Sequence, residues 1–182
     1  MSNTPLSISL SSPIEEKIAW ARRQQHVFGE ALLKDGEIAG LLNALKTAVV
    51  SSRTEMARTG IVEICRRCDQ EEGGSCCGAG IENRYDGWLL LINLLLGVVL
   101  PEKRLRPDAC FFAGEKGCLL AARHVLCVNY LCKKVTDQID PPAIAALREK
   151  EGAEVNILFI LHERIKNVLK RWMSDSGTPS QK

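Results

Sequence analysis

Eight cysteines dominate the chemistry that this sequence could perform, and all of them lie between residues 65 and 132. Thiolates are soft ligands, and groups of four hold zinc ions or iron–sulfur clusters. Because no cysteine lies outside this window, we expect the window to hold a metal centre rather than thiols scattered through a core. The predicted metal ligands are Cys65, Cys68, Cys76, Cys77, Cys110, Cys118, Cys127 and Cys132.

Two short motifs open the window. Cys65 and Cys68 form a C-x2-C element, a spacing at which two thiolates can reach one ion across a turn. The adjacent pair Cys76 and Cys77 follows in a glycine-rich stretch. Adjacent side chains diverge on a regular element, so both sulfurs can approach one centre only where glycines let the backbone bend. Such a loop also presents free N–H groups that stabilise anionic sulfur.

The four later cysteines cannot all lie on one helix and share one site. A helix advances about 100° per residue, which would place Cys118 and Cys127 on opposite sides of it. We therefore expect a break near Arg123 and His124. The total of eight thiols leaves open whether there are two four-thiolate centres, or one centre with cysteines left over.

The order of these motifs resembles a known family. The early pairs are followed by Cys110-Phe111-Phe112, Gly117-Cys118-Leu119-Leu120, Arg123, Cys127 and Tyr130-Leu131-Cys132. Over residues 65 to 132 this order is similar to the YkgJ-like cysteine-cluster family, described as zinc- or iron-chelating domains, although His124 stands where the family has proline. The resemblance implies metal binding by the cysteines. A more distant resemblance, to flagellin lysine methylases, implies an iron–sulfur centre used with S-adenosylmethionine.

Other polar residues have a structural and a functional interpretation. His162 lies on an apolar stripe, which favours a hydrogen-bonded core histidine over a ligand. His124 can donate to a thiolate or pack against its neighbours. Arg66, Arg67 and Arg123 can offset thiolate charge or be solvated. No phosphate loop, dinucleotide fingerprint or nucleophile elbow is present, and we assign no catalytic residue.

The composition is that of an ordinary globular chain, with 46% hydrophobic and 25% charged residues and a net charge of +2. The 24 basic and 22 acidic residues and the scarcity of aromatic ones argue against nucleic acid as a partner. The longest apolar stretch, from Trp88 to Leu100, is too short to span a membrane and predicts a buried helix. With no signal peptide pattern at residues 1 to 14, we expect a cytoplasmic protein.

The flanking segments predict helices that support the cysteine window. Ser12, Pro13 and Glu15 predict a capped helix start, and Gly36 a stop, so residues 13 to 59 are expected to form an antiparallel helical hairpin. A further long helix is expected over 141 to 173. The predicted fold is a single, mainly α domain (13–173): a helical hairpin plus a long C-terminal helix, supporting a glycine-rich, cysteine-rich metal-binding cap at 61–134. Residues 1–12 and 174–182 are expected to be a flexible N-terminus and a disordered tail.

The function predicted from the sequence is metal binding, through an iron–sulfur cluster, such as 4Fe-4S, or zinc. Sulfur-only ligation leans towards iron–sulfur, with zinc close behind. The bound centre could serve redox chemistry, metal handling or sensing. The alternatives are a cluster-dependent enzyme resembling a protein methylase, and a structural zinc module that binds a protein partner.

Overall fold

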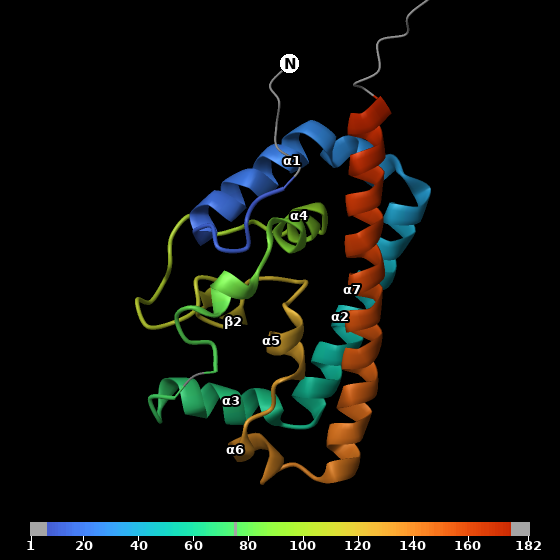
Figure 1. Ribbon diagram of the computed structural model, residues 1–182. Coiled ribbons are helices and arrows are strands. Elements are labelled where there is room, and N and C mark those ends of the chain that lie inside the picture. Colours follow the sequence, from blue (N-terminus) through green and yellow to red (C-terminus); the bar gives the residue numbers. More distant parts are fainter. Residues whose placement is uncertain (1–6, 75, 176–182) are drawn as a thin grey trace, which may run out of the picture.

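The fold is described from a computed structural model that covers residues 7–74 and 76–175. It is mainly helical, as the sequence predicts, and its strands form one short antiparallel hairpin within the described residues (Figure 1). The elements in chain order are α1 (Ile14–Lys34), α2 (Gly36–Arg58), α3 (Ile61–Gln70), the 3-10 helix η1 (Ile81–Arg84), α4 (Gly87–Leu95), β1 (Ala113–Gly114), β2 (Gly117–Cys118), α5 (Val125–Asn129), α6 (Lys133–Thr136) and α7 (Pro141–Asp175).

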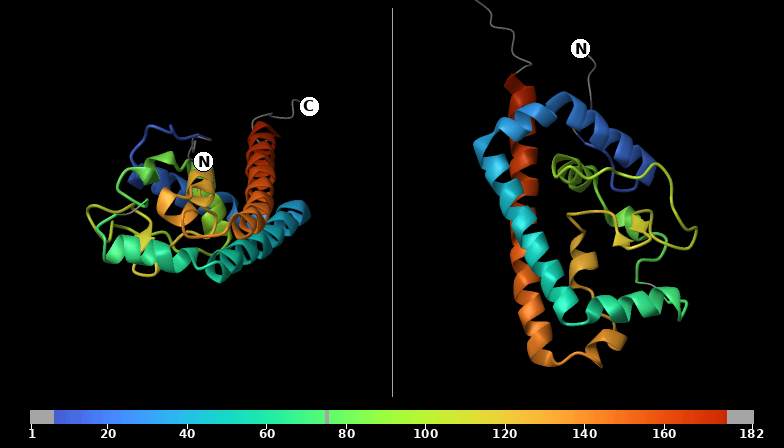
Figure 2. Two further views of the ribbon diagram at one scale, coloured as in Figure 1. Left: turned by 90° about the horizontal axis from the view of Figure 1, so that it is seen from below. Right: turned by 180° about the vertical axis from the view of Figure 1, so that it is seen from behind.

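The long C-terminal helix α7 packs antiparallel to α2 (Figures 1 and 2). Arg164 pairs with Glu37 at 2.9 Å near the start of α2, and the Ser52 hydroxyl donates to Glu154 towards its end. Low residue numbers on α2 therefore meet high ones on α7. The predicted helix over 141–173 is confirmed and extends to Asp175.

The junction of α1 and α2 is tighter than the sequence predicted. Asp35 alone separates the helices, and its carboxylate accepts from the backbone N–H groups of Glu37 and Ile38 at 3.1 and 3.0 Å. This cap starts α2 in a new direction, so α1 crosses one end of the molecule and packs mainly on α4 (Figure 1). The expected antiparallel hairpin of 13–59 is therefore wrong, because α7 and α4 take the faces that α1 and α2 would have shared.

The predicted buried helix is α4. All of its residues except Trp88 are buried, and Asp86 caps its first turn by accepting from the N–H of Leu89 at 2.7 Å. At its N-terminus the helix touches α1: a Cβ on Gly87 would lie 2.4 Å from Cε3 of Trp20. The close approach of α1 and α4 therefore requires glycine at this position.

The predictions for the chain ends are tested in part. Ser12 gives no capping bond to α1, which begins after Pro13 without a side-chain cap. Residues 7 to 12 form a turn from which Ile8 packs on the core. Ser174 and Asp175, expected in the disordered tail, are instead the last residues of α7. The other positions of the expected flexible N-terminus and tail, 1–6 and 176–182, lie outside the described residues.

Two hydrophobic clusters make up the core. The large cluster is formed mainly by α1, α2, α4 and α7 together with residues 110–112 and 120–122. The small cluster lies under α3, α6 and the start of α7 and consists of Ile61, Ile64, Val135 and Leu147, with Cys132 and other side chains packed against it. The cysteine window spans both clusters, so each one can support part of it.

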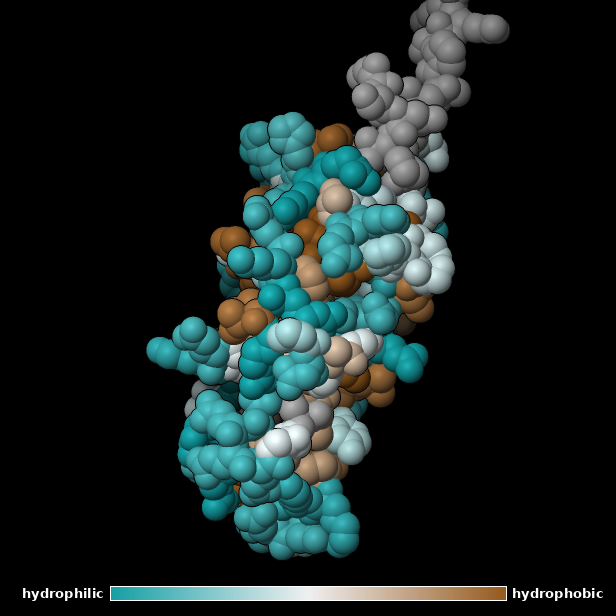
Figure 3. Space-filling model, turned by 90° about the vertical axis from the view of Figure 1, so that its left-hand side faces the viewer, coloured by the Kyte–Doolittle hydropathy of each residue, from teal (hydrophilic) through white to brown (hydrophobic). Residues whose placement is uncertain are grey.

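One face of the molecule is mostly hydrophilic (Figure 3). On the face seen in Figure 3, hydrophobic side chains form small patches separated by hydrophilic ones. Across the two described ranges, none of the helices combines the length and the apolar character needed to cross a membrane.

Candidate metal centre

The cysteines lie on six segments of the chain, and all eight are thiols rather than disulfides. Cys65 and Cys68 are on α3, and the adjacent pair lies in the turn beyond it. Later in the chain, Cys110 precedes the β hairpin, Cys118 is in β2, Cys127 is in α5 and Cys132 directly precedes α6. The fold therefore has to bring together residues that are up to 67 positions apart.

The helix α3 presents Cys65 and Cys68 on one face, since they are three residues apart. The chain then turns back on this helix: the N–H of Gly74 donates to the carbonyl of Cys68 at 3.0 Å, and a Cβ on Gly74 would lie 3.2 Å from the Cys68 sulfur. The glycine-rich stretch therefore brings the backbone close to the Cys68 thiol. This turn leads directly to Cys76.

Cys132, from the segment directly before α6, joins Cys65, Cys68 and Cys76. The pKa of Cys65 is raised by reduced hydration and then by the charges of Cys132, Cys76 and Cys68, in that order. The pKa of Cys76 is raised by reduced hydration, and then by the charge of Cys132 and a hydrogen bond with it. We call these four residues the helix group: Cys65, Cys68, Cys76 and Cys132.

The other thiols meet around the β hairpin. The carbonyl of Cys77 accepts from the N–H of Cys110 at 2.6 Å, and the N–H of Ala79 donates to the backbone carbonyl of Asp108 at 2.9 Å. The hairpin then pairs Ala113 with Cys118 and returns the chain towards Cys110. With Cys127 of α5 these residues form what we call the hairpin group: Cys77, Cys110, Cys118 and Cys127.

The hairpin-group thiols also affect one another electrostatically. Reduced hydration, then the charges of Cys118 and Cys127, raise the pKa of Cys77 to about 11. Burial raises the pKa of Cys110 to about 12, and the charges of Glu82, Cys118 and Cys77 add to this effect. These thiols are protonated at neutral pH, so metal binding would release protons.

Two backbone N–H groups donate to sulfur in the hairpin group. Cys110 accepts from Phe112, and Cys118 accepts from Leu120, which in each case lowers the thiol pKa against the larger effect of reduced hydration. In both cases the donor is two residues beyond the cysteine. Donors fixed in this way stabilise sulfur as it becomes anionic.

Tyr85 lies beside the hairpin group and was not predicted from the sequence. Its buried hydroxyl accepts from the N–H of His124 at 3.1 Å and lies 3.7 Å from the sulfur of Cys127. Reduced hydration, followed by the charges of Cys118 and Cys127, raises the pKa of Tyr85. No sequence signal could have revealed this contact, because Tyr85 lies far along the chain from these cysteines.

The predicted break near Arg123 and His124 is confirmed. The helix α5 begins at Val125, and the Nδ1 atom of His124 caps it by accepting from the N–H of Leu126 at 3.2 Å. The His124 ring lies 5.8 Å from that of Tyr85. His124 therefore has the packing role that the sequence left open, together with a capping role.

Cationic side chains accompany both groups. Lys134 lies 3.6 Å from the Cys68 sulfur and pairs with Glu72. Arg53 donates to the carbonyl of Leu120 at 2.6 Å, and its charge and that of Arg123 oppose the raised pKa of Cys118. Of these three residues only Arg123 was proposed from the sequence, because Arg53 lies outside the cysteine window and Lys134 just beyond it.

The other two arginines proposed from the sequence differ from Arg123. Arg66 pairs with Glu63 at 2.8 Å and Glu71 at 3.3 Å on the exposed side of α3. Arg67 is exposed. The Nε of Arg123, in contrast, is buried and has no hydrogen-bond partner among the described residues. Arg123 is therefore the better placed of the three to offset charge on the thiols.

The thiols are not arranged as a finished metal site. In the described part of the chain, no three His, Cys, Asp or Glu side chains lie as a group that could hold a metal ion. Cys76 and Cys77 have different partners, although they are adjacent: Cys76 is hydrogen-bonded to Cys132, and the carbonyl of Cys77 accepts from the N–H of Cys110. A metal centre would require the thiols to move into a common ligand set.

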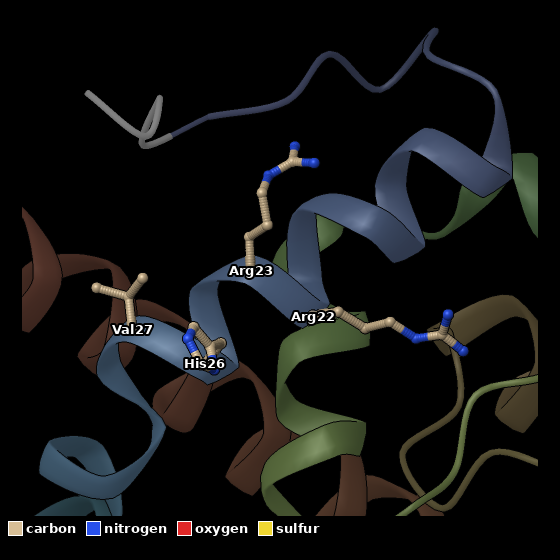
Figure 4. Close-up of a pocket in the computed structure, with 4 residues that line it drawn as sticks. All are labelled: Arg22, Arg23, His26 and Val27. Atoms are coloured by element: carbon tan, nitrogen blue, oxygen red, sulfur yellow. The ribbon is translucent and has the colours of Figure 1, made fainter. Parts of the chain in front are cut away.

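Two surface hollows lie away from the cysteines. One of about 360 Å³ is lined by Arg22, Arg23, His26 and Val27 of α1, whose side chains point in different directions (Figure 4). A second, of about 190 Å³, lies between α1 and the segment around Pro101 and Phe111. Neither is lined by a cysteine, so neither places a substrate beside the thiols.

No protein-family model matches this chain, and no curated protein or solved structure has significant similarity to it. The resemblance to the YkgJ-like family therefore stays a prediction from the order of the cysteines. The support for a function comes from the cysteines of this chain and the side chains around them.

Proposed function

We propose that this protein binds metal through cysteine thiolates, as an iron–sulfur cluster or as zinc. The observation that supports this most is the contact between cysteines from distant parts of the chain, such as Cys76 with Cys132 and Cys77 with Cys110. Each thiol makes its neighbours harder to ionise. A shared cation reverses this effect, because it favours the thiolate form of all of them.

The surroundings of the thiols suit a negatively charged centre. Four thiolates on a divalent ion leave a net charge of about −2. Lys134 beside Cys68, and Arg53 and Arg123 beside Cys118, carry charges that offset it. The N–H groups of Phe112 and Leu120 add fixed hydrogen-bond donors to sulfur.

The ligand chemistry narrows the choice of metal. Sulfur-only ligation disfavours hard ions such as Mg²⁺ and Ca²⁺ and favours zinc or iron–sulfur clusters. Both choices agree with the zinc- or iron-chelating character of the family that the sequence resembles. A role in electron transfer, metal delivery or metal sensing follows from such a centre.

A cluster-dependent methylase is less well supported. Such an enzyme needs a cavity beside its cluster for S-adenosylmethionine and substrate. The two hollows described above are next to α1 and contain no cysteine. Metal binding without a catalytic role accounts for the cysteines and does not require a cavity beside them.

The test is to purify the protein without oxygen and to measure iron, zinc, acid-labile sulfide and the visible spectrum. We expect either iron and sulfide with broad absorbance near about 400 nm, or zinc without colour. As a control, His26→Gln on the exposed surface of α1 should keep the full metal content. A protein that contains no metal, and takes up neither zinc nor a reconstituted cluster, would contradict the proposal.

A further inference from the structure

We propose that the eight thiols form two separate four-thiolate centres, the helix group at one and the hairpin group at the other. The first would use Cys65, Cys68, Cys76 and Cys132, and the second Cys77, Cys110, Cys118 and Cys127. This inference rests on the proposed function, because it assumes that the cysteines bind metal. It adds which thiols share an ion or cluster, and it assigns the adjacent cysteines to different centres.

The two groups rest on different parts of the core. Cys132 packs against the small cluster, which also anchors α3 through Ile61 and Ile64. Cys110 belongs to the large cluster, and Cys127 packs against it. Each group is therefore supported by its own set of buried side chains.

The backbone at the adjacent pair explains how it can be divided. Cys77 is held against Cys110 by the 2.6 Å hydrogen bond from the Cys110 N–H, and Gly78 forms an antiparallel bridge with Ala109 directly after it. Cys76 and Cys77 both lie in a turn, between the glycine-rich stretch that folds back on α3 and the bridge at Gly78. One step along the chain can thus direct the two sulfurs to different centres.

The contacts of the adjacent cysteines follow the same division. Cys76 is hydrogen-bonded to Cys132, whereas Cys77 is bonded through its carbonyl to the N–H of Cys110. The two centres would therefore be neighbours, joined through the peptide bond between the adjacent cysteines.

Each group has its own compensating charge. Lys134 approaches the Cys68 sulfur, and its charge also acts on Cys76. Arg53 and Arg123 act on Cys118 in the hairpin group. Two centres of about −2 each would need two such sources of positive charge, and the cations are divided accordingly.

Metal binding requires the thiols to move, because those in the described residues do not yet form a metal-ligand set. Rotation of a cysteine side chain from one staggered conformer to another moves its sulfur by about 3 Å.

The test uses the full chain, prepared without oxygen, with Zn²⁺ as the probe. We expect the wild-type protein to bind two ions, and Cys76→Ser and Cys77→Ser to bind one each. The remaining thiols are then alkylated and mapped by mass spectrometry. In Cys76→Ser the hairpin group should be protected and the helix group reactive, and in Cys77→Ser the pattern should be reversed.

Double variants test the same division by stoichiometry. The within-group variant Cys65→Ser/Cys68→Ser should still bind one ion, whereas the cross-group variant Cys68→Ser/Cys118→Ser should bind none. Identical protection patterns in Cys76→Ser and Cys77→Ser, or loss of all zinc from the within-group variant while its helices are retained by circular dichroism, would overturn the division. A wild-type protein that binds no zinc and no cluster would instead overturn the proposed function. If the cross-group variant does not fold, the two adjacent single variants decide the question.

Discussion

At the scale of single residues, the hydroxyl of Tyr85 connects the helical core to the hairpin group. It accepts from the N–H of His124, at the start of α5, and lies next to the Cys127 sulfur on the same helix. The ring packs against Phe112 at a centroid distance of 5.2 Å. One side chain thus holds the segment that carries Cys127 against the segment that follows Cys110.

We predict that Tyr85→Phe lowers the free energy of unfolding of the metal-free protein by about 1–3 kcal/mol. The ring would stay packed, but the N–H of His124 would lose its acceptor in a partly buried place. Urea unfolding followed by circular dichroism measures the change. Tyr130, whose side chain is 63% exposed, provides a matched control, and Tyr130→Phe should change the stability by less than about 0.5 kcal/mol. Equal effects of the two substitutions would contradict this role.

Two glycines in helices are predicted to respond oppositely to alanine. At Gly87 a Cβ would overlap the ring of Trp20, so Gly87→Ala should destabilise the protein by about 1–3 kcal/mol. At Gly152, inside α7, a Cβ would meet nothing within 4 Å, so Gly152→Ala should stabilise it by up to about 1 kcal/mol. Thermal unfolding of both variants checks the signs. A destabilising Gly152→Ala would indicate that the glycine has a role in bending α7.

At the scale of elements, an ion pair joins α4 to α7. The Nε2 of His162 lies 3.0 Å from the Asp86 carboxylate, and Nδ1 lies 3.2 Å from Glu163. Burial alone would lower the pKa of His162, but the hydrogen bond and charge of Asp86 outweigh it and raise the pKa above 6.5. Lys166, which pairs with Glu163, opposes the shift. His162 is therefore hydrogen-bonded, as the sequence predicts, but it is partly buried at the edge of the core rather than a core residue.

This pair gives a prediction for pH. A histidine whose pKa is raised on folding stabilises the protein below its unfolded pKa of 6.5, and this contribution is lost as the pH rises through the folded pKa. The pKa of His124 is lowered by burial, which gives a contribution of the opposite sign, so the comparison must be made between variants. The stability advantage of the wild type over His162→Gln should shrink from pH 6 to pH 9 in urea titrations. A constant difference would contradict the assigned ion pair.

The sequence predicted individual elements better than their packing. The range of α2, the long α7 and the break before Val125 follow from local signals such as caps and apolar periodicity. The packing of α1 on α4 instead of along α2 does not follow from local signals. It depends on which apolar faces meet in three dimensions. Tyr85 and Arg53 were missed for the same reason: each meets the cysteine segments across many intervening residues.

At the scale of the whole molecule, the two clusters differ greatly in size. The large cluster unites most of the buried side chains from four helices, and Asn93 of α4 fixes the segment before α5 to it by bonding both the N–H and the carbonyl of Ala122. The small cluster has four buried members. At about 1.5–3 kcal/mol for each buried apolar side chain, it offsets the conformational entropy of only a few residues.

The region of α3 and α6 should therefore depend on metal more than the rest of the protein. We predict that removing metal with a chelator speeds hydrogen exchange of the α3 amides by at least about tenfold, while the amides of α4 change little. The reason is that the helix group links α3 to the segment before α6, and a metal would add a crosslink where the hydrophobic contacts are few. Hydrogen exchange read by mass spectrometry, in the presence and absence of Zn²⁺, measures both regions in one sample. The Cys76→Ser variant serves as the matched control, because its α3 amides should exchange at the metal-free rate even when zinc is present. Equal protection of α3 with and without metal would show that the four buried side chains hold this region without help.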